Sequence, residues 1–310
     1  MAKTDLTKSL LSRFDRLKAQ RQNWETHWQE VADYMQPRKA DVTKTRSKGD
    51  KRTELIFDSS PIQAVELLAA SLHGMLTNPS TPWFSLRFKN SELEMEDEAK
   101  LWLESATDVM YTAFNRSNFQ QEIFELYHDL ITFGTAAMFI QEDNEDILKF
   151  STRHINEIFI AEDDKGRIDT VYRKFKLSVR SAIQQFGTKI STDIQAQEKK
   201  DPYNEVDILH VVYPRSDFNP NLKDTENMPF ESVYIEMKNG NELSVSGFQE
   251  FPFVVPRYLS ITRNLWKITS YDSLARRKDA KRDVKNYNQS CAETSGPTAI
   301  SSGWWFLITS

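Results

Sequence analysis

The residues best suited to metal chemistry gather on one predicted helix. Glu122, Glu125 and His128 are spaced three positions apart, so they share one helical face. A Glu-x-x-His pair is half of the signature of di-iron carboxylate proteins, whose fold needs a second such pair on another helix. The sequence holds no second pair. A structural helix face with a solvated or hydrogen-bonded histidine is therefore the favoured interpretation.

The other groups capable of catalysis are dispersed. His27, His73, His154 and His210 stand apart, and no spacing joins them into a metal site or a proton-transfer pair. The single cysteine, Cys291, has no partner for a disulfide or a zinc site. The sequence lacks the glycine-rich phosphate loop, the dinucleotide fingerprint, the nucleophile elbow and the zinc-protease motif. We therefore expect no enzymatic activity, no cofactor and no metal.

A basic segment interrupts the pattern between residues 39 and 52. Helical periodicity is lost there, which predicts a loop or a flexible insertion. Its clustered basic residues are the candidate contacts with DNA or a protein partner, although a charge run is more often only a solvated segment. They are Lys44, Arg46, Lys48, Lys51 and Arg52.

The overall charge limits what the chain can bind. With 40 basic and 45 acidic residues, its formal net charge is −5. Tight nucleic-acid binding depends on neutralising phosphates with Lys and Arg, so the balance argues against a protein that grips DNA. An acidic channel wall would instead let DNA slide past. The sequence shows no apolar run long enough for a membrane span and no signal-peptide pattern, so we expect a cytosolic protein.

Helical patterns dominate the first 134 residues. Apolar residues at steps of three, four and seven predict a long amphipathic helix that ends before Pro37, with its stripe packed in the core rather than on a neighbouring subunit. The stripe consists of Leu10, Phe14, Leu17, Trp24, Trp28, Val31 and Met35.

Capping residues at 58–61 predict a second helix that runs to about Met75. Its expected buried face comprises Ile62, Val65, Leu68, Ala69 and Leu72. A short alternating strand is predicted at 83–88, followed by helices at 92–116 and 118–133, the second stopped by Gly134.

Alternating patterns replace helical ones beyond Thr135. Two hairpins are predicted, joining 155–161 to 168–175 and 232–238 to 242–248. The second carries Asn239-Gly240, a dipeptide typical of a two-residue turn with positive φ at both positions. A helix at 178–186, closed by Gly187, and a strand at 206–213 are expected between the hairpins. The fold class is therefore α+β, a helix-rich N-terminal part followed by a mostly antiparallel β region.

Nine short stretches resemble the head-to-tail connecting (portal) family of short-tailed, podovirus-type bacteriophages. They are WETHW at 24–28, FDSS at 57–60, LAASLHGMLT at 68–77, PWFSL at 82–86, DLITFGTA at 129–136, GRID at 166–169, FG at 186–187, HVVYPR at 210–215 and PFVVPR at 252–257. No single stretch is specific. Their order and spacing over residues 1 to about 259 carry the resemblance.

The resemblance implies a structural role. Portal subunits form a ring at one capsid vertex, and double-stranded DNA passes through the hole without sequence specificity. Ring contacts join one face of a subunit to a different face of the next. A terminase docks while the head fills and tail or adaptor proteins replace it, so ATP hydrolysis resides in the partner. The implied locations are the virion and, during assembly with capsid and scaffolding proteins, the host cytoplasm.

The end of the chain departs from that family. Where such portals continue into a long helical stem, the chain reads LSITRN at 259–264, and no charged residue follows Glu293. We expect three regions: 1–134 helical, 135–259 β-rich, and 260–310 an atypical tail. The tail predicts a reading-frame shift near Leu259 and a missing stem, with a natural short variant as the alternative. Competing functions are a soluble α+β interaction protein, an enzyme without a recognisable motif, and a truncated, non-functional portal fragment.

Overall fold

The computed structural model describes residues 3–47, 49–88, 96–219 and 224–258. The chain divides into two compact units, Met1–Thr269 and Ser270–Ser310. The second unit lies wholly outside the described residues. The predictions for residues 260–310, including the frame shift near Leu259 and the missing stem, therefore fall outside the described part, and a domain boundary at residue 134 stays a prediction.

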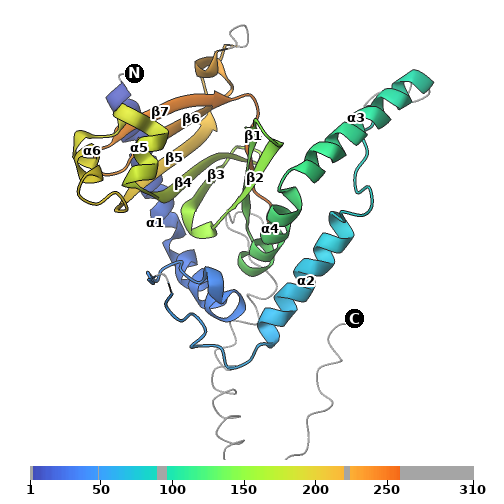
Figure 1. Cartoon of the computed structure of the whole chain (residues 1–310), viewed down its shortest axis with the longest axis horizontal. Coiled ribbons are helices and arrows are strands. Elements are labelled where there is room, and N and C mark those ends of the chain that lie inside the picture. The colour runs from blue at the N-terminus through green and yellow to red at the C-terminus, as the bar shows by residue number, and fades with distance from the viewer. Residues whose placement is uncertain (1–2, 48, 89–95, 220–223, 259–310) are drawn as a thin grey trace, which may run out of the picture. The chain divides into compact units, whose positions relative to one another are not determined.

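The helices follow the predicted order (Figure 1). They are α1 (Lys3–Met35), α2 (Ser60–Leu76), α3 (Asp97–Arg116) and α4 (Phe119–Phe133), with a 3₁₀ turn, η1 (Pro37–Lys39), after the first. Helix α1 ends before Pro37, which cannot continue its hydrogen-bond pattern. Helix α4 ends at Gly134, whose left-handed φ of 76° is what a C-terminal glycine supplies.

The predicted stripe of α1 packs in the core. Leu10, Phe14, Trp28, Val31 and Met35 are all buried, as the helical spacing required. The expectation of core packing, rather than exposure for a neighbouring subunit, is confirmed for these five residues.

The predicted strand at 83–88 is wrong. The segment has no strand partner, and the amides of Trp83 and Phe84 both donate to the Tyr111 hydroxyl of α3, at 2.6 and 2.7 Å. That hydroxyl in turn donates to the carbonyl of Phe84 at 2.8 Å. The consecutive rings of Trp83 and Phe84 both pack against Phe114 of α3 instead of taking part in a sheet. Helix α3 begins at Asp97 after an extended Glu96, and predicted helical positions 92–95 lie outside the described residues.

The β region forms two antiparallel sheets. The first has the order β2-β1-β8 and the second the order β3-β4-β5-β6-β7. The strands are β1 (Ala137–Asp143), β2 (Ile147–Arg153), β3 (Ile158–Glu162), β4 (Ile168–Ser178), β5 (Glu205–Pro214), β6 (Phe230–Glu236), β7 (Asn241–Phe248) and β8 (Phe253–Val254). Short helices α5 (Val179–Phe186) and α6 (Thr192–Glu198) lie between β4 and β5 in the chain. The predicted α+β class is confirmed.

Both predicted hairpins form, but the second turn differs from the prediction. Residues 237–240 connect β6 to β7, and Gly240 alone among them has a positive φ, 68°. The Gly240 amide donates to the carbonyl of Glu236 at 2.9 Å, while the Asn239 amide group bonds to the Glu236 carboxylate. A four-residue connection closed by one left-handed glycine replaces the expected two-residue turn. The β1–β2 hairpin and α6 were not predicted.

The five-stranded sheet is covered on both faces (Figure 1). The N-terminal half of α1 packs on one face, where Leu10 and Phe14 meet Phe159, Tyr172 and Leu209. Helices α5 and α6 cover one part of the opposite face, through a cluster that includes Phe186 and Ile208. The three-stranded sheet covers another part, through a cluster that includes Phe139, Phe253 and Val212. Alternation along each strand produces this two-sided burial.

A row of polar side chains, which we call the polar row, crosses the strands on this second face of the five-stranded sheet, between these two clusters. Arg173, His210 and Tyr234 are directly opposite one another on β4, β5 and β6. The His210 ring stacks on Tyr234, with centroids 4.1 Å apart, and its Nε2 lies 2.9 Å from the hydroxyl of Ser232. Burial, helped by the charges of Arg173 and Arg153, lowers the pKa of His210 to about 3. The folded protein therefore holds this imidazole neutral.

His210 should make stability depend on pH. The unfolded chain protonates this histidine near its ordinary pKa of about 6.5, whereas the folded chain does not until about pH 3. The unfolded state thus binds more protons in this window, and stability falls as pH drops, by at most about 1.4 kcal/mol per pH unit. Urea unfolding from about pH 7 to pH 5 should show a smaller fall for His210→Gln than for the unaltered protein. Equal slopes for the two proteins would contradict a neutral buried His210.

A buried arginine connects α1 to the sheets. Arg21 is 1% exposed, and its guanidinium donates to the carbonyls of Ile155, Asn156 and Ile158 at 2.9, 3.0 and 2.5 Å. These carbonyls belong to the 3₁₀ turn η3 (Ile155–Glu157) and the start of β3. The same guanidinium pairs with Glu25 at 2.7 Å and lies 3.6 Å from the centroid of the Phe159 ring. One side chain thus satisfies three backbone acceptors and balances its own charge.

Replacing Arg21 should weaken the whole fold. Arg21→Met keeps much of the side-chain volume but removes one donor from three carbonyls and the charged partner from the Glu25 carboxylate, at an expected cost of about 3 kcal/mol or more. Lys18→Met, on an exposed position of the same helix, should change stability by less than about 0.5 kcal/mol. Chemical denaturation of the three proteins measures the difference. A loss below about 1 kcal/mol for Arg21→Met would show that water replaces the guanidinium at these carbonyls.

Candidate interaction surfaces

The acidic and histidine residues of α4 lie on separate contacts. Glu122 accepts a hydrogen bond from the Thr152 amide at 2.6 Å, Glu125 pairs with Lys39 at 2.7 Å, and His128 lies 3.3 Å from a Glu66 oxygen. Among the described residues, no group of three or more His, Cys, Asp or Glu side chains is arranged to hold a metal ion. Each side chain instead fixes α4 to a different neighbour.

Three of the five candidate basic residues pair with carboxylates of the same chain. Lys44 and Arg46 contact the buried Asp33 at 2.5 and 3.2 Å. Arg52 contacts Asp41 at 2.6 Å, and Arg46 reaches the same carboxylate at 3.2 Å. Lys51 is exposed, and Lys48 lies outside the described residues. Contact of this segment with DNA or a partner stays a prediction, but most of its described charge is already balanced.

The loop that carries these residues is held against α1 by one amide side chain. Gln29 of α1 is buried, and its Oε1 accepts from the amides of Val42, Thr43 and Lys44 at 3.0, 2.8 and 3.2 Å. Its Nε2 donates to the carbonyl of Ala40 at 2.6 Å. The predicted loop is present, and these bonds satisfy backbone groups that no helix or sheet would otherwise satisfy.

The pairing predicts that Arg46 and Lys51 contribute differently to stability. Arg46→Gln should destabilise the chain by about 1 kcal/mol, because the buried Asp33 loses a charged donor. Lys51→Gln should change stability by less than about 0.5 kcal/mol. Urea denaturation distinguishes these outcomes, and equal small effects would indicate that the Arg46 contacts add nothing to stability.

Large apolar side chains on α2 and α3, and one just before α2, are left exposed by the described part of the chain. We call this set the α2–α3 surface, and its members are Phe57, Leu67, Met75, Leu76, Leu101, Trp102, Val109 and Met110. In α2, only Val65 and Ala69 of the predicted face are buried, while Leu67 and Met75 on another face are 71% and 82% exposed. Their off-face positions were visible in the sequence, but the absence of a covering element was not.

Helix α3 has very little of its surface buried. Ala113 is its single buried residue among the described side chains. Trp102 and Val109, seven positions apart and so on one helical face, are 63% and 69% exposed. In Figure 1, the C-terminal end of α3 lies next to α4, and the rest of the helix extends away from both sheets. Several large apolar side chains left exposed on two helices are typical of a protein interface.

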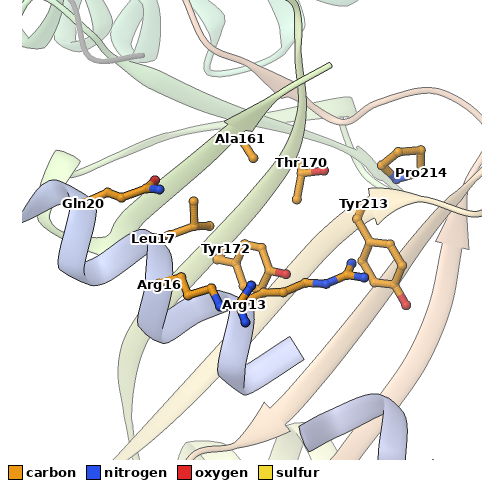
Figure 2. A pocket seen from close by; sticks show the side chains of 9 residues that line it. All are labelled: Arg13, Arg16, Leu17, Gln20, Ala161, Thr170, Tyr172, Tyr213 and Pro214. Atoms are coloured by element: carbon orange, nitrogen blue, oxygen red, sulfur yellow. The ribbon is translucent and has the colours of Figure 1, made fainter. Parts of the chain in front are cut away.

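A small cavity opens where α1 crosses the five-stranded sheet (Figure 2). Its volume is about 350 Å³, and Figure 2 shows Arg13 lying between the rings of Tyr172 and Tyr213. Arg13 hydrogen-bonds to Tyr172, and the Tyr213 hydroxyl donates to Glu231 at 2.7 Å. No buried side-chain atom without a partner lies among its described lining residues. The cavity therefore gives no indication of a particular ligand.

Comparisons with known proteins identify the family. The model of the bacteriophage head to tail connecting protein family matches residues 7–267. The chain is 32% identical over 271 residues to the probable portal protein of Bordetella phage BPP-1, covering 86% of this chain and 49% of that protein. It is 31% identical over 263 residues to the portal protein of Salmonella phage epsilon15, covering 83% and 47%.

The match to each relative covers most of this chain but only part of that relative. The chain spans about half the length of both curated relatives. No helix in the described part of the chain is long and apolar enough to cross a membrane. Because the family model extends over most of the chain, from the start of α1 past the end of β8, the protein belongs to the bacteriophage head to tail connecting protein family.

Proposed function

We propose that this chain acts as a portal subunit, forming a ring at one capsid vertex. Double-stranded DNA passes through the ring during packaging and ejection. A terminase docks on it first, and tail or adaptor proteins dock afterwards. The protein resides at the portal vertex of the virion and, during assembly with capsid and scaffolding proteins, in the host cytoplasm. It is a structural protein without enzymatic activity.

The family match over residues 7–267, together with two relatives named as portal proteins, carries this proposal. The charge distribution supports it. A net charge of −5, and a basic segment in which Lys44, Arg46 and Arg52 pair with Asp33 and Asp41, give no excess of cations to hold phosphates in place. DNA can then move past the surface without strong binding at any one position.

The α2–α3 surface supports the ring contact. A closed ring needs heterologous contacts, in which an apolar patch on one subunit meets a different patch on the next. Leu67, Met75, Trp102 and Val109 supply exposed apolar groups on two helices that the described chain leaves uncovered. Burying such side chains between subunits contributes roughly 25 cal/mol for each Å² removed from water. We therefore assign one side of the ring contact to this surface.

Assembly tests the proposal. Negative-stain microscopy and mass photometry of the purified chain should show closed rings. Trp102→Glu combined with Val109→Glu should abolish them, because each charge would have to be buried in the contact. Circular dichroism should remain unchanged, since both side chains are exposed in the subunit.

Tyr203→Glu is the matched control. Tyr203 is also a large exposed side chain, at 73%, but it lies between α6 and β5, outside the α2–α3 surface. Its variant should still form rings. Loss of rings in this control alone would place the contact elsewhere, and a monomer at all concentrations would favour a soluble α+β interaction protein or a non-functional fragment.

A further inference from the structure

Arg153 and Arg173 lie on different sheets within electrostatic range of each other, and among the described residues only Arg173 of the two pairs with a carboxylate. Arg173, in the polar row of the five-stranded sheet, pairs with Glu157 at 2.8 Å. Arg153 is the last residue of β2 in the three-stranded sheet, and its guanidinium lies 5.9 Å from the centroid of the Phe139 ring. Phe139 in turn contacts the His210 ring of the polar row, with centroids 5.9 Å apart. Arg153 thus lies beside Phe139 of one sheet, and Arg173 lies beside His210 of the other, where the two rings meet.

Arg153 has no partner for its charge among the described residues. Within the described part of the chain it makes no hydrogen bond or ion pair, and its Nε is buried without an acceptor. Arg215 also has a buried unpaired Nε, but its guanidinium pairs with Glu231 at 3.3 Å. Of the three side-chain nitrogens of Arg153, only Nε is both buried and without a partner, so the two terminal nitrogens retain contact with solvent. These two nitrogens are therefore free to bond an acceptor from outside the described part of the chain.

The surrounding charges leave Arg153 undercompensated. Burial, and after it the like charge of Arg173, lowers the pKa of Arg153. Glu157 and Glu122 oppose this effect, but Glu157 is bonded to Arg173 and Glu122 to the Thr152 amide. His210 cannot add a negative charge, and Tyr234 is kept protonated because burial raises its pKa. The space between the sheets therefore favours one additional negative charge.

We propose that Arg153, with Arg173 and the Tyr234 hydroxyl beside it, forms a binding site for a single carboxylate, supplied by an Asp or Glu side chain of another polypeptide. A planar guanidinium matches a carboxylate through two parallel hydrogen bonds, and one negative charge balances the excess. An extended Asp or Glu side chain can reach the half-buried Arg153 guanidinium. A DNA duplex is too wide to bring its phosphates to that guanidinium. The site is separate from the α2–α3 surface and does not depend on the ring proposal.

Acetate is the probe for this site. In protein labelled with ¹⁵N-arginine, the buried Nε–H of Arg153 should give a resolved NMR signal, assigned by its loss in Arg153→Gln. Sodium acetate should shift this signal saturably, and sodium chloride at equal ionic strength should not. Inorganic phosphate is the second arm of the experiment. A linear drift that matches chloride, or tighter binding of phosphate than of acetate, would overturn the carboxylate site.

Two charge-changing variants should move the affinity in opposite directions. Arg153→Gln should weaken stabilisation by acetate, followed by thermal unfolding, about tenfold or more, because a charged pair of donors is lost. Glu157→Gln removes a competing negative charge with little change of shape, so it should tighten acetate binding several-fold. Arg167→Gln, on the exposed turn of the β3–β4 hairpin, should leave the affinity unchanged. Destabilisation by Arg153→Gln and Glu157→Gln with no opposite change in acetate affinity would show that Arg153 has only a packing role.

Discussion

The buried guanidinium of Arg21 is the interaction on which the arrangement of helices and sheets depends. Three carbonyls near the start of β3 accept hydrogen bonds from this guanidinium, and that of Ile155 also accepts from the Ile158 amide at the end of η3. A buried carbonyl without a donor is costly, so one long cationic side chain from α1 fixes the position of that helix. On one side of Arg21, Leu10 and Phe14 pack on the five-stranded sheet. On the other side, Trp28 and Ala32 join the cluster that includes Phe133 of α4.

Many charged side chains around the loop after α1 pair with other residues of the same chain. Gln29, Asp33 and the basic residues after α1 form one network that holds an irregular loop in place. Lys39 inserts between Glu125 and the buried Asp129, so the same loop is also tied to α4. Cations used in this way are poorly placed to neutralise phosphates. This local pairing is consistent with the portal role proposed above, in which DNA would move past the subunit.

Two features of the fold stay open to partners, and they differ in chemistry. The α2–α3 surface is apolar and lies on helices with few buried residues, so it can release water over a broad contact. Arg153 carries a charge that no described residue pairs with, so it can accept one carboxylate through two parallel hydrogen bonds. A broad apolar contact provides affinity, whereas a charged pair between chains favours one register over others. The two features would therefore contribute different properties to an assembly.

The sequence by itself determined the elements whose signals are local. Helical spacing placed the stripe of α1, Gly134 marked the end of α4, and the turn residues at 163–166 located the β3–β4 hairpin. These predictions succeeded because capping, periodicity and turn chemistry depend on neighbours in the chain. The family resemblance was also readable from short stretches in order.

Only the tertiary structure decided which patterned residues meet. Alternation at 83–88 looked like a strand, but Tyr111 of α3 supplied the hydrogen bonds and no strand formed. The basic residues near Arg46 suggested a cluster open to solvent or a partner. Asp33, which precedes the whole loop in sequence, lies beside Arg46 in space. The site at Arg153 had no sequence signal, because it depends on one sheet packing on the other. Contacts of this kind are long-range, and no local pattern of residue types contains them.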